Sequence, residues 1–158
     1  MARVAYISFL IIGILIIIMV GCSNQDKTIS VADDDQEMNN AIAKARETLP
    51  QFWQRFDNPE SGDSDFSIKL RITDKDEVEH FWMTDIERKD GQIYGKVSNE
   101  PDTITNVKLG DRLQIPEKDI SDWYYMHNGK MVGNYTLRVL LKHMSAKEAQ
   151  QYKSLLAD

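Results

Sequence analysis

The sequence predicts an α+β fold: a curled antiparallel sheet or small barrel of about five to six strands, bracketed by N-terminal and C-terminal helices. Two patterns predict this class. Apolar residues recur at steps of three and four along residues 38–56 and again along residues 137–156, which is helical spacing. Between them, residues 66–132 contain short stretches of alternating polar and apolar residues separated by turns, which is typical of antiparallel strands.

The composition limits the class of protein. The chain has 158 residues, a formal net charge of −6 and one cysteine. One cysteine excludes an intramolecular disulfide framework and zinc sites built from several cysteines. Because the chain has no basic excess to neutralise phosphates, we expect it not to bind nucleic acid. The length suits one ordinary domain, which we place at residues 36–158.

The N-terminal segment predicts export and a membrane anchor. Arg3 precedes an uncharged apolar run at residues 4–20, which is long for a signal peptide and short for a membrane-spanning helix. The next residues, Met19-Val20-Gly21-Cys22, resemble a bacterial lipobox, in which a signal peptidase cuts ahead of a lipid-modified cysteine. We therefore predict a lipoprotein signal peptide at residues 1–21 and lipidation of Cys22. The alternative is that Cys22 ends an uncleaved transmembrane helix.

This anchor also predicts a location. Several acyl chains on Cys22 would hold the chain durably on a membrane of the bacterial cell envelope. Ser23 follows the cysteine, which in bacteria with two membranes resembles the signal for transfer to the outer membrane, facing the periplasm. Residues 22–35 are polar, acidic and without periodicity, so they indicate a flexible tether between anchor and domain.

Two helical segments flank the predicted sheet. Asp34 and Glu37 have the spacing of an N-terminal cap for the first, and Ser145 and Glu148 form a capping box for the last. Pro50 lacks the amide proton that a helix interior needs, so we expect a kink or a break near Thr48. The apolar stripe of the first helix consists of Met38, Ala41, Ile42, Ala45, Leu49, Phe52, Trp53 and Phe56.

The strands differ in how clearly the sequence marks them. Residues 66–72 alternate strictly between apolar and polar and give the clearest strand. Asp90-Gly91 tolerates positive φ and predicts a hairpin between residues 79–87 and 92–98. Further strands are predicted at residues 112–115, 120–126 and 131–132.

The search for chemistry yields few candidates. His80 and Asp85 are an odd number of residues apart on one predicted strand, so their side chains point to opposite faces and cannot easily share a metal ion. No phosphate-binding or dinucleotide-binding glycine pattern occurs. We therefore expect no metal and no cofactor. The candidates for catalysis are His80, Asp122 and Arg138.

An aromatic concentration gives a second kind of candidate. Tyr and Trp are enriched at protein interfaces, so these residues either pack in the core or form a recognition surface. On a strand, neighbouring aromatic residues face opposite ways, so one of each pair fills the core. The candidate surface consists of Trp82, Trp123, Tyr125, Lys130 and Tyr135.

Several blocks together resemble a known family. They are Glu79-His80-Phe81-Trp82, Asp85, Lys108 with Gly110-Asp111, Ile120-Ser121-Asp122-Trp123 and the run from Asn128 to Arg138. In this order, over about residues 66–144, the sequence resembles the bacterial family called domain of unknown function 2314, to which YegJ-like lipoproteins belong. The resemblance implies a bacterial domain that is often exported, with no established activity, substrate or catalytic residue.

Two functions from different classes follow. The first is a periplasm-facing binding or protein-interaction module on a lipid anchor, of the kind that immunity proteins represent, with an envelope protein as its partner. The second is a small-molecule hydrolase or other envelope enzyme, which requires His80, Asp122 and Arg138 to converge in one pocket.

Lipobox processing is directly testable. Globomycin, which inhibits the lipoprotein signal peptidase, is expected to cause accumulation of an unprocessed precursor, detected by immunoblot of cell fractions. A Cys22→Ser chain is expected to lose incorporation of labelled palmitate, because the thiol is the acylated group. Processing that is insensitive to globomycin would contradict the lipobox assignment.

Overall fold

The computed structural model describes residues 36–158, so the predicted signal peptide, Cys22 and the tether at residues 22–35 lie outside the described residues. Each strand predicted from alternation is present. The elements are α1 (Gln36–Asp57), β1 (Asp63–Asp74), β2 (Glu77–Lys89), β3 (Gln92–Val97), β4 (Arg112–Gln114), η1 (Glu117–Asp119), β5 (Ile120–His127), β6 (Lys130–Gly133), α2 (Tyr135–Leu140), η2 (Leu141–His143) and α3 (Ala146–Leu155).

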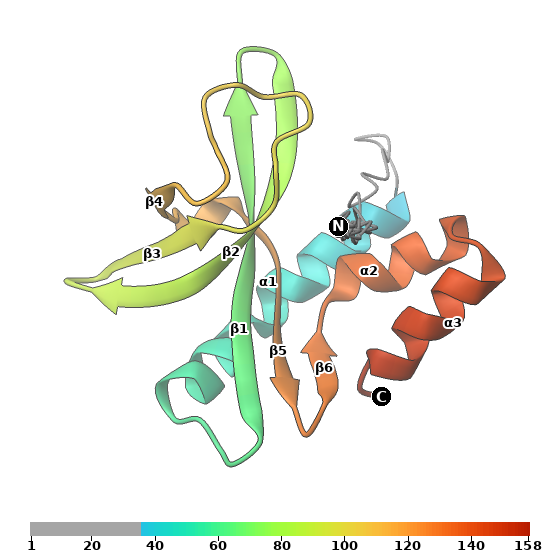
Figure 1. The fold of residues 1–158 in the computed structure, drawn as a ribbon. Helices are drawn as coiled ribbons and strands as arrows, with labels where there is room; N and C mark the ends of the chain where they lie inside the picture. Colours follow the sequence, from blue (N-terminus) through green and yellow to red (C-terminus); the bar gives the residue numbers. More distant parts are fainter. Residues whose placement is uncertain (1–35) are drawn as a thin grey trace, which may run out of the picture.

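The strands form one antiparallel six-stranded sheet in the order β4-β3-β2-β1-β5-β6. This confirms the α+β class. Of the two predicted forms, the curled sheet is the one observed, because β4 and β6 remain edge strands and do not pair with each other. Figure 1 shows β2 bending so that the β2–β3 hairpin points away from β5 and β6.

Two aspartates bend the long strands. The pairing register shifts between Ser64 and Ser67 in β1 and between Thr84 and Glu87 in β2. Each shift contains an aspartate with positive φ, Asp65 at 53° and Asp85 at 48°. A bulge of this kind bends and twists the strand that carries it, so these two positions curl the sheet. Strict alternation could not predict them.

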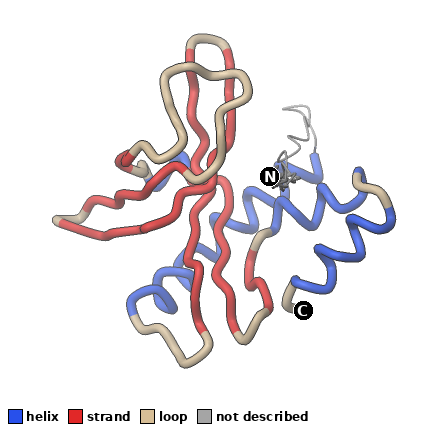
Figure 2. The backbone as a smooth tube through the Cα atoms, viewed as in Figure 1, coloured by secondary structure: helices blue, strands red, loops and turns tan. Residues whose placement is uncertain are grey.

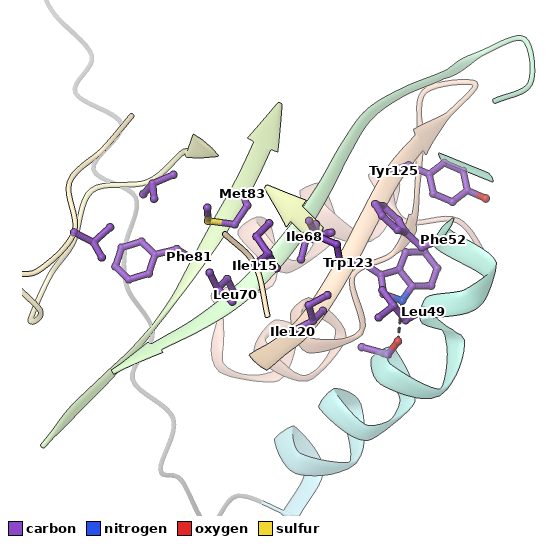
Figure 3. Packing of buried hydrophobic residues seen from close by; sticks show 14 of the residues in the cluster. Leu49, Phe52, Ile68, Leu70, Phe81, Met83, Ile115, Ile120, Trp123 and Tyr125 are labelled. Carbon is purple, nitrogen blue, oxygen red and sulfur yellow. Dashed lines mark hydrogen bonds between the residues drawn. The ribbon is translucent and has the colours of Figure 1, made fainter. Parts of the chain in front are cut away.

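The main core lies on one face of the sheet, part of it under α1; it also includes Ile93, Val97, Ile104, Val107 and Ile115. Figure 1 shows α1 crossing β1 and β5 obliquely, and Figure 3 shows its apolar residues meeting those of the strands. Trp123 is 2% exposed and donates its indole N–H to the carbonyl of Ala45 at 2.8 Å. Phe52 packs on the same indole, with ring centroids 5.6 Å apart.

Helix α1 is continuous through Pro50, so of the two predicted alternatives, a kink or a break near Thr48, the break is wrong. Proline costs a helix interior about 3 kcal/mol through a lost hydrogen bond and a steric clash. The helix persists because its residues on both sides of Pro50, including Ala45 and Phe52, are fully buried against the sheet. Tertiary packing therefore overrides the local preference.

The connection between β3 and β4, residues 98–111, folds back beside β1 and β2 (Figure 2). Two carboxylates hold it. Glu79 is buried and accepts from the backbone N–H groups of residues 102–104 at 2.9–3.4 Å. Asp74 accepts from the N–H and the hydroxyl of Thr105, both at 2.9 Å, and these bonds lower the pKa of Asp74 below its ordinary 3.8. Its contribution to stability is thus present above pH 3.8 and lost as the pH falls through the lower folded-state pKa.

The C-terminal helices pack beside β6 and form a second apolar cluster with Met131. The predicted capping box at Ser145 and Glu148 is confirmed, with both reciprocal hydrogen bonds formed. Ala157 donates its N–H to the carbonyl of Met131 at 2.9 Å and so covers part of the β6 edge. None of the described helices has both the length and the apolar character needed to cross a membrane.

Gly133 offers a sharp test of the packing. A Cβ there would lie 2.5 Å from the Trp123 carbonyl oxygen and 2.6 Å from its ring, at a φ of +87°. We expect Gly133→Ala to lower the free energy of unfolding in urea by about 3 kcal/mol, from overpacking and backbone strain together. Gly91→Ala is the matched control, because its φ is +75° but nothing lies within 4 Å, so about 1 kcal/mol is expected. Equal losses would contradict the close approach.

Candidate functional site

The candidate site lies on the face of β1, β2 and β5 that points away from α1. Along each strand its residues alternate with core residues such as Ile68, Phe81 and Trp123. Cross-strand pairing brings them together: Lys69 lies opposite Trp82 on one side and opposite Asp122 on the other. We call this region the outer face, defined by Lys69, His80, Trp82 and Tyr124.

An aromatic pair and an ammonium group dominate the outer face. Trp82 and Tyr124 are both half-buried and meet edge to face, with ring centroids 4.8 Å apart. The Lys69 ammonium lies 4.5 Å from the centroid of the Trp82 ring, at cation–π distance. It also donates to the hydroxyl of Thr136 at 2.7 Å. The Lys69 ammonium thus holds the Trp82 indole on one side, while part of the ring stays accessible.

Burial lowers the pKa of Lys69 below its ordinary 10.5, and the nearby Asp122 carboxylate only partly opposes this. The charged form of Lys69 therefore opposes folding at pH values below its folded-state pKa. That penalty falls as the pH rises through the folded-state pKa toward 10.5, because the unfolded chain then binds more protons than the folded one. Lys69 is consequently kept at a cost in stability.

Asp122 has a structural role. It has no exposed surface, and one carboxylate oxygen accepts from the N–H groups of Trp123 at 2.9 Å and Tyr135 at 3.1 Å. The other accepts from the N–H of Thr136 at 2.8 Å and from its hydroxyl at 2.6 Å. The side chain of Asn134, at the N-cap position, makes no capping hydrogen bond. Asp122 therefore caps α2 from the neighbouring strand.

His80, on the outer face, is paired with Ser121. Nδ1 of His80 lies 2.7 Å from Oγ of Ser121, which also donates to the carbonyl of Lys69 at 3.2 Å. A hydroxyl has one proton, so when Ser121 donates it to that carbonyl, His80 is the donor to Ser121 and does not activate it. Ser121 also has no exposed surface. The pair cannot work as an accessible nucleophile and base in this conformation.

The three predicted catalytic residues do not converge in one pocket. Arg138 is exposed on α2 and donates to the carbonyl of Ala157 at 2.8 Å, whereas Asp122 is sealed under the start of that helix. Two cavities of about 310 and 470 Å³ occur in the described part of the chain, and neither is lined by His80, Asp122 or Arg138. This geometry gives the enzyme hypothesis no support.

The predicted interaction surface divides between the faces of the sheet. Trp123 and Tyr125 are 2% and 7% exposed, so their assignment to a surface is corrected: both belong to the core. The reason is register, because Trp123 lies opposite Ile68 on the core face. Tyr135 packs edge-on against Trp123, with centroids 5.7 Å apart, and Lys130 is exposed on β6, where it donates to the carbonyl of Ser154. Of the five, only Trp82 lies on the outer face.

Sequence reasoning missed Lys69, and of the neighbouring pair Trp123 and Tyr124 it assigned the wrong residue to the surface. The signal was present, since Lys69 is a polar position in the clearest alternating strand. The alternation alone did not show which residues of the neighbouring strands pair with Lys69. Within residues 36–158, no group of three or more histidine, cysteine, aspartate or glutamate side chains is placed to hold a metal ion.

The capping role of Asp122 predicts a large stability effect. An Asp122→Asn side chain in either orientation places an NH₂ group against two hydrogen-bond donors. We expect a loss of about 3 kcal/mol in the free energy of unfolding. Asp111→Asn is the control, because this carboxylate accepts one backbone bond, from Lys108, in an exposed turn and should cost about 1 kcal/mol. An Asp122→Asn loss no larger than the control would contradict the cap.

Comparison with known proteins places the chain in a family. It is 36% identical over 131 residues to uncharacterized protein YegJ of Escherichia coli (strain K12), covering 83% of this chain and 84% of that protein. It is 31% identical over 130 residues to a protein of Neisseria meningitidis serogroup B that is named as an ankyrin repeat protein, covering 77% of this chain and 51% of the relative. The chain thus spans about half of that second relative, and no solved structure matches.

A family match covers nearly all of the described residues. The profile of the family described as an uncharacterized protein conserved in bacteria matches residues 35–157, from just before α1 to the end of the C-terminal segment. The chain therefore belongs to this conserved bacterial family, DUF2314.

Proposed function

We propose that this chain is an exported lipoprotein, held on the bacterial cell envelope through Cys22, whose domain binds an envelope protein through the outer face. The observation that carries the proposal is the accessible Trp82–Tyr124 pair, set on a buried polar support. The anchor comes from the lipobox-like Met19–Cys22 segment, and residues 23–35 would tether the domain to it.

The outer face has the physical properties of a binding hot spot. Tryptophan and tyrosine carry much of the energy of protein interfaces because they bury a large area at a low cost in side-chain entropy. Trp82 is already fixed from one side by Lys69 and from another by Tyr124, so little of its freedom remains to be lost on binding. Such preorganisation favours recognition by this surface.

The second relative is consistent with an interaction role. Ankyrin repeats, for which that Neisseria protein is named, are stacked helical units that present extended binding surfaces. The region shared with this chain accounts for about half of that protein. We propose that the sheet domain also binds a protein, without ankyrin repeats of its own.

Site-specific crosslinking in cells tests the proposal. A photoreactive amino acid in place of Tyr124 is expected to give a discrete crosslinked species with one envelope protein, identified by mass spectrometry. Trp82→Ala in the same chain is expected to reduce that species at least tenfold, because the main aromatic contact is lost.

Trp53 supplies the matched control. It is also half-buried and lies under a cation, with Arg88 4.9 Å from its ring centroid, but it belongs to α1. A crosslinker at position 53 should give no such species, and Trp53→Ala should leave the crosslink from position 124 intact. Equal crosslinking from positions 53 and 124, or a crosslink unaffected by Trp82→Ala, would refute the outer face as the binding surface.

A further inference from the structure

A cleft lies where the curled sheet fails to close. Strand β5 begins at Ile120, opposite Leu70, so the last part of β1 has a neighbour only on its β2 side. The β4 strand pairs with β3 alone. Between the open parts of β1 and β4 is a cavity of about 470 Å³. Its size is within the range of roughly 300–1,000 Å³ that small-molecule sites occupy.

Both long walls of this cleft are strand edges. Residues 71–73 of β1 and residues 113–114 of β4 line it. Backbone N–H and C=O groups on the unpaired side of a strand favour another peptide, which can form the hydrogen bonds of an added strand. The Thr73 carbonyl already accepts from the side-chain amide of Asn106 at 3.2 Å. The exposed edge is therefore only a few residues long.

The cleft carries one group of each charge. Arg71 is exposed, and its guanidinium donates to the hydroxyl of Thr73 at 3.3 Å without forming an ion pair within residues 36–158. Asp119, half-buried in η1, likewise has no ion pair among the described side chains. Both border the cleft, together with the apolar side chains of Ile72 and Leu113 and the ring of Pro116.

We infer that the β1–β4 cleft binds a short zwitterionic peptide, with its carboxylate toward Arg71, its ammonium group toward Asp119 and an apolar side chain against Leu113 and Pro116. The charges of Arg71 and Asp119 select the two charged ends of the peptide, and the strand edges select its backbone. The residues on which the proposed partner-binding surface depends, Trp82 and Tyr124, do not line this cleft. The two proposals can therefore fail separately.

Calorimetric titration of the detergent-solubilised full chain with glycyl-leucyl-glycine tests the inference. We expect saturable binding at one site per chain. Amidating the peptide carboxylate or acetylating its amine should each weaken binding about tenfold. Absence of saturable binding at millimolar peptide would overturn the inference.

Two substitutions assign the ends of the peptide. In Arg71→Gln the free and amidated peptides should bind equally, and in Asp119→Asn the free and acetylated peptides should bind equally. Arg71→Lys, which keeps the charge, should retain a preference for the free carboxylate, and Trp82→Ala should leave binding unchanged. Binding that keeps its sensitivity to both end groups in Arg71→Gln and Asp119→Asn would refute the site.

Discussion

The carboxylate of Asp122 is the interaction on which the rest of the structure depends. It joins β5 to the start of α2 through three hydrogen bonds, from Tyr135 and Thr136, and accepts a fourth from the N–H of Trp123 in its own strand. It also lies beside the ammonium of Lys69. A buried carboxylate is tolerated only where donors surround it, because transfer from water is costly. Next to Asp122 along β5, Trp123 lies against the backbone of Gly133, and its indole N–H donates to the carbonyl of Ala45 in α1. The same anchor supports the core on one face and the aromatic pair on the other.

Carboxylates play a similar part elsewhere in the fold. Glu79 and Asp74 accept from backbone N–H groups of the long connection after β3, which has no helix or strand of its own to satisfy them. Each carboxylate thus accepts hydrogen bonds from backbone N–H groups that a helix or strand would otherwise satisfy. The curled sheet stays open. The connection lies beside β1, and β4 is only three residues long. Openness creates the cleft that a closed barrel would lack.

The same residue type has different roles on the two faces of the sheet. Trp123 pairs with Ile68 of β1, and Trp82 pairs with the next residue, Lys69. Trp123 is nevertheless buried in the core, whereas Trp82 is half exposed. Lys69 links them, because its strand carries Ile68 toward Trp123 and its ammonium toward Trp82. In the proposed function, a partner would bind this surface without rearranging the core beneath it.

By itself the sequence determined the local features: the α+β class, the strands marked by alternation, the Asp90-Gly91 hairpin, the capping box at Ser145 and the family resemblance. These depend on residues close together in the chain. Only the tertiary structure decided that α1 continues through Pro50, that Trp123 is core while Trp82 is surface, and that Asp122 caps a helix rather than serving chemistry. The physical reason is that alternation defines two faces of a strand but not which one a distant helix covers. A carboxylate's role likewise depends on which backbone donors the fold brings to it.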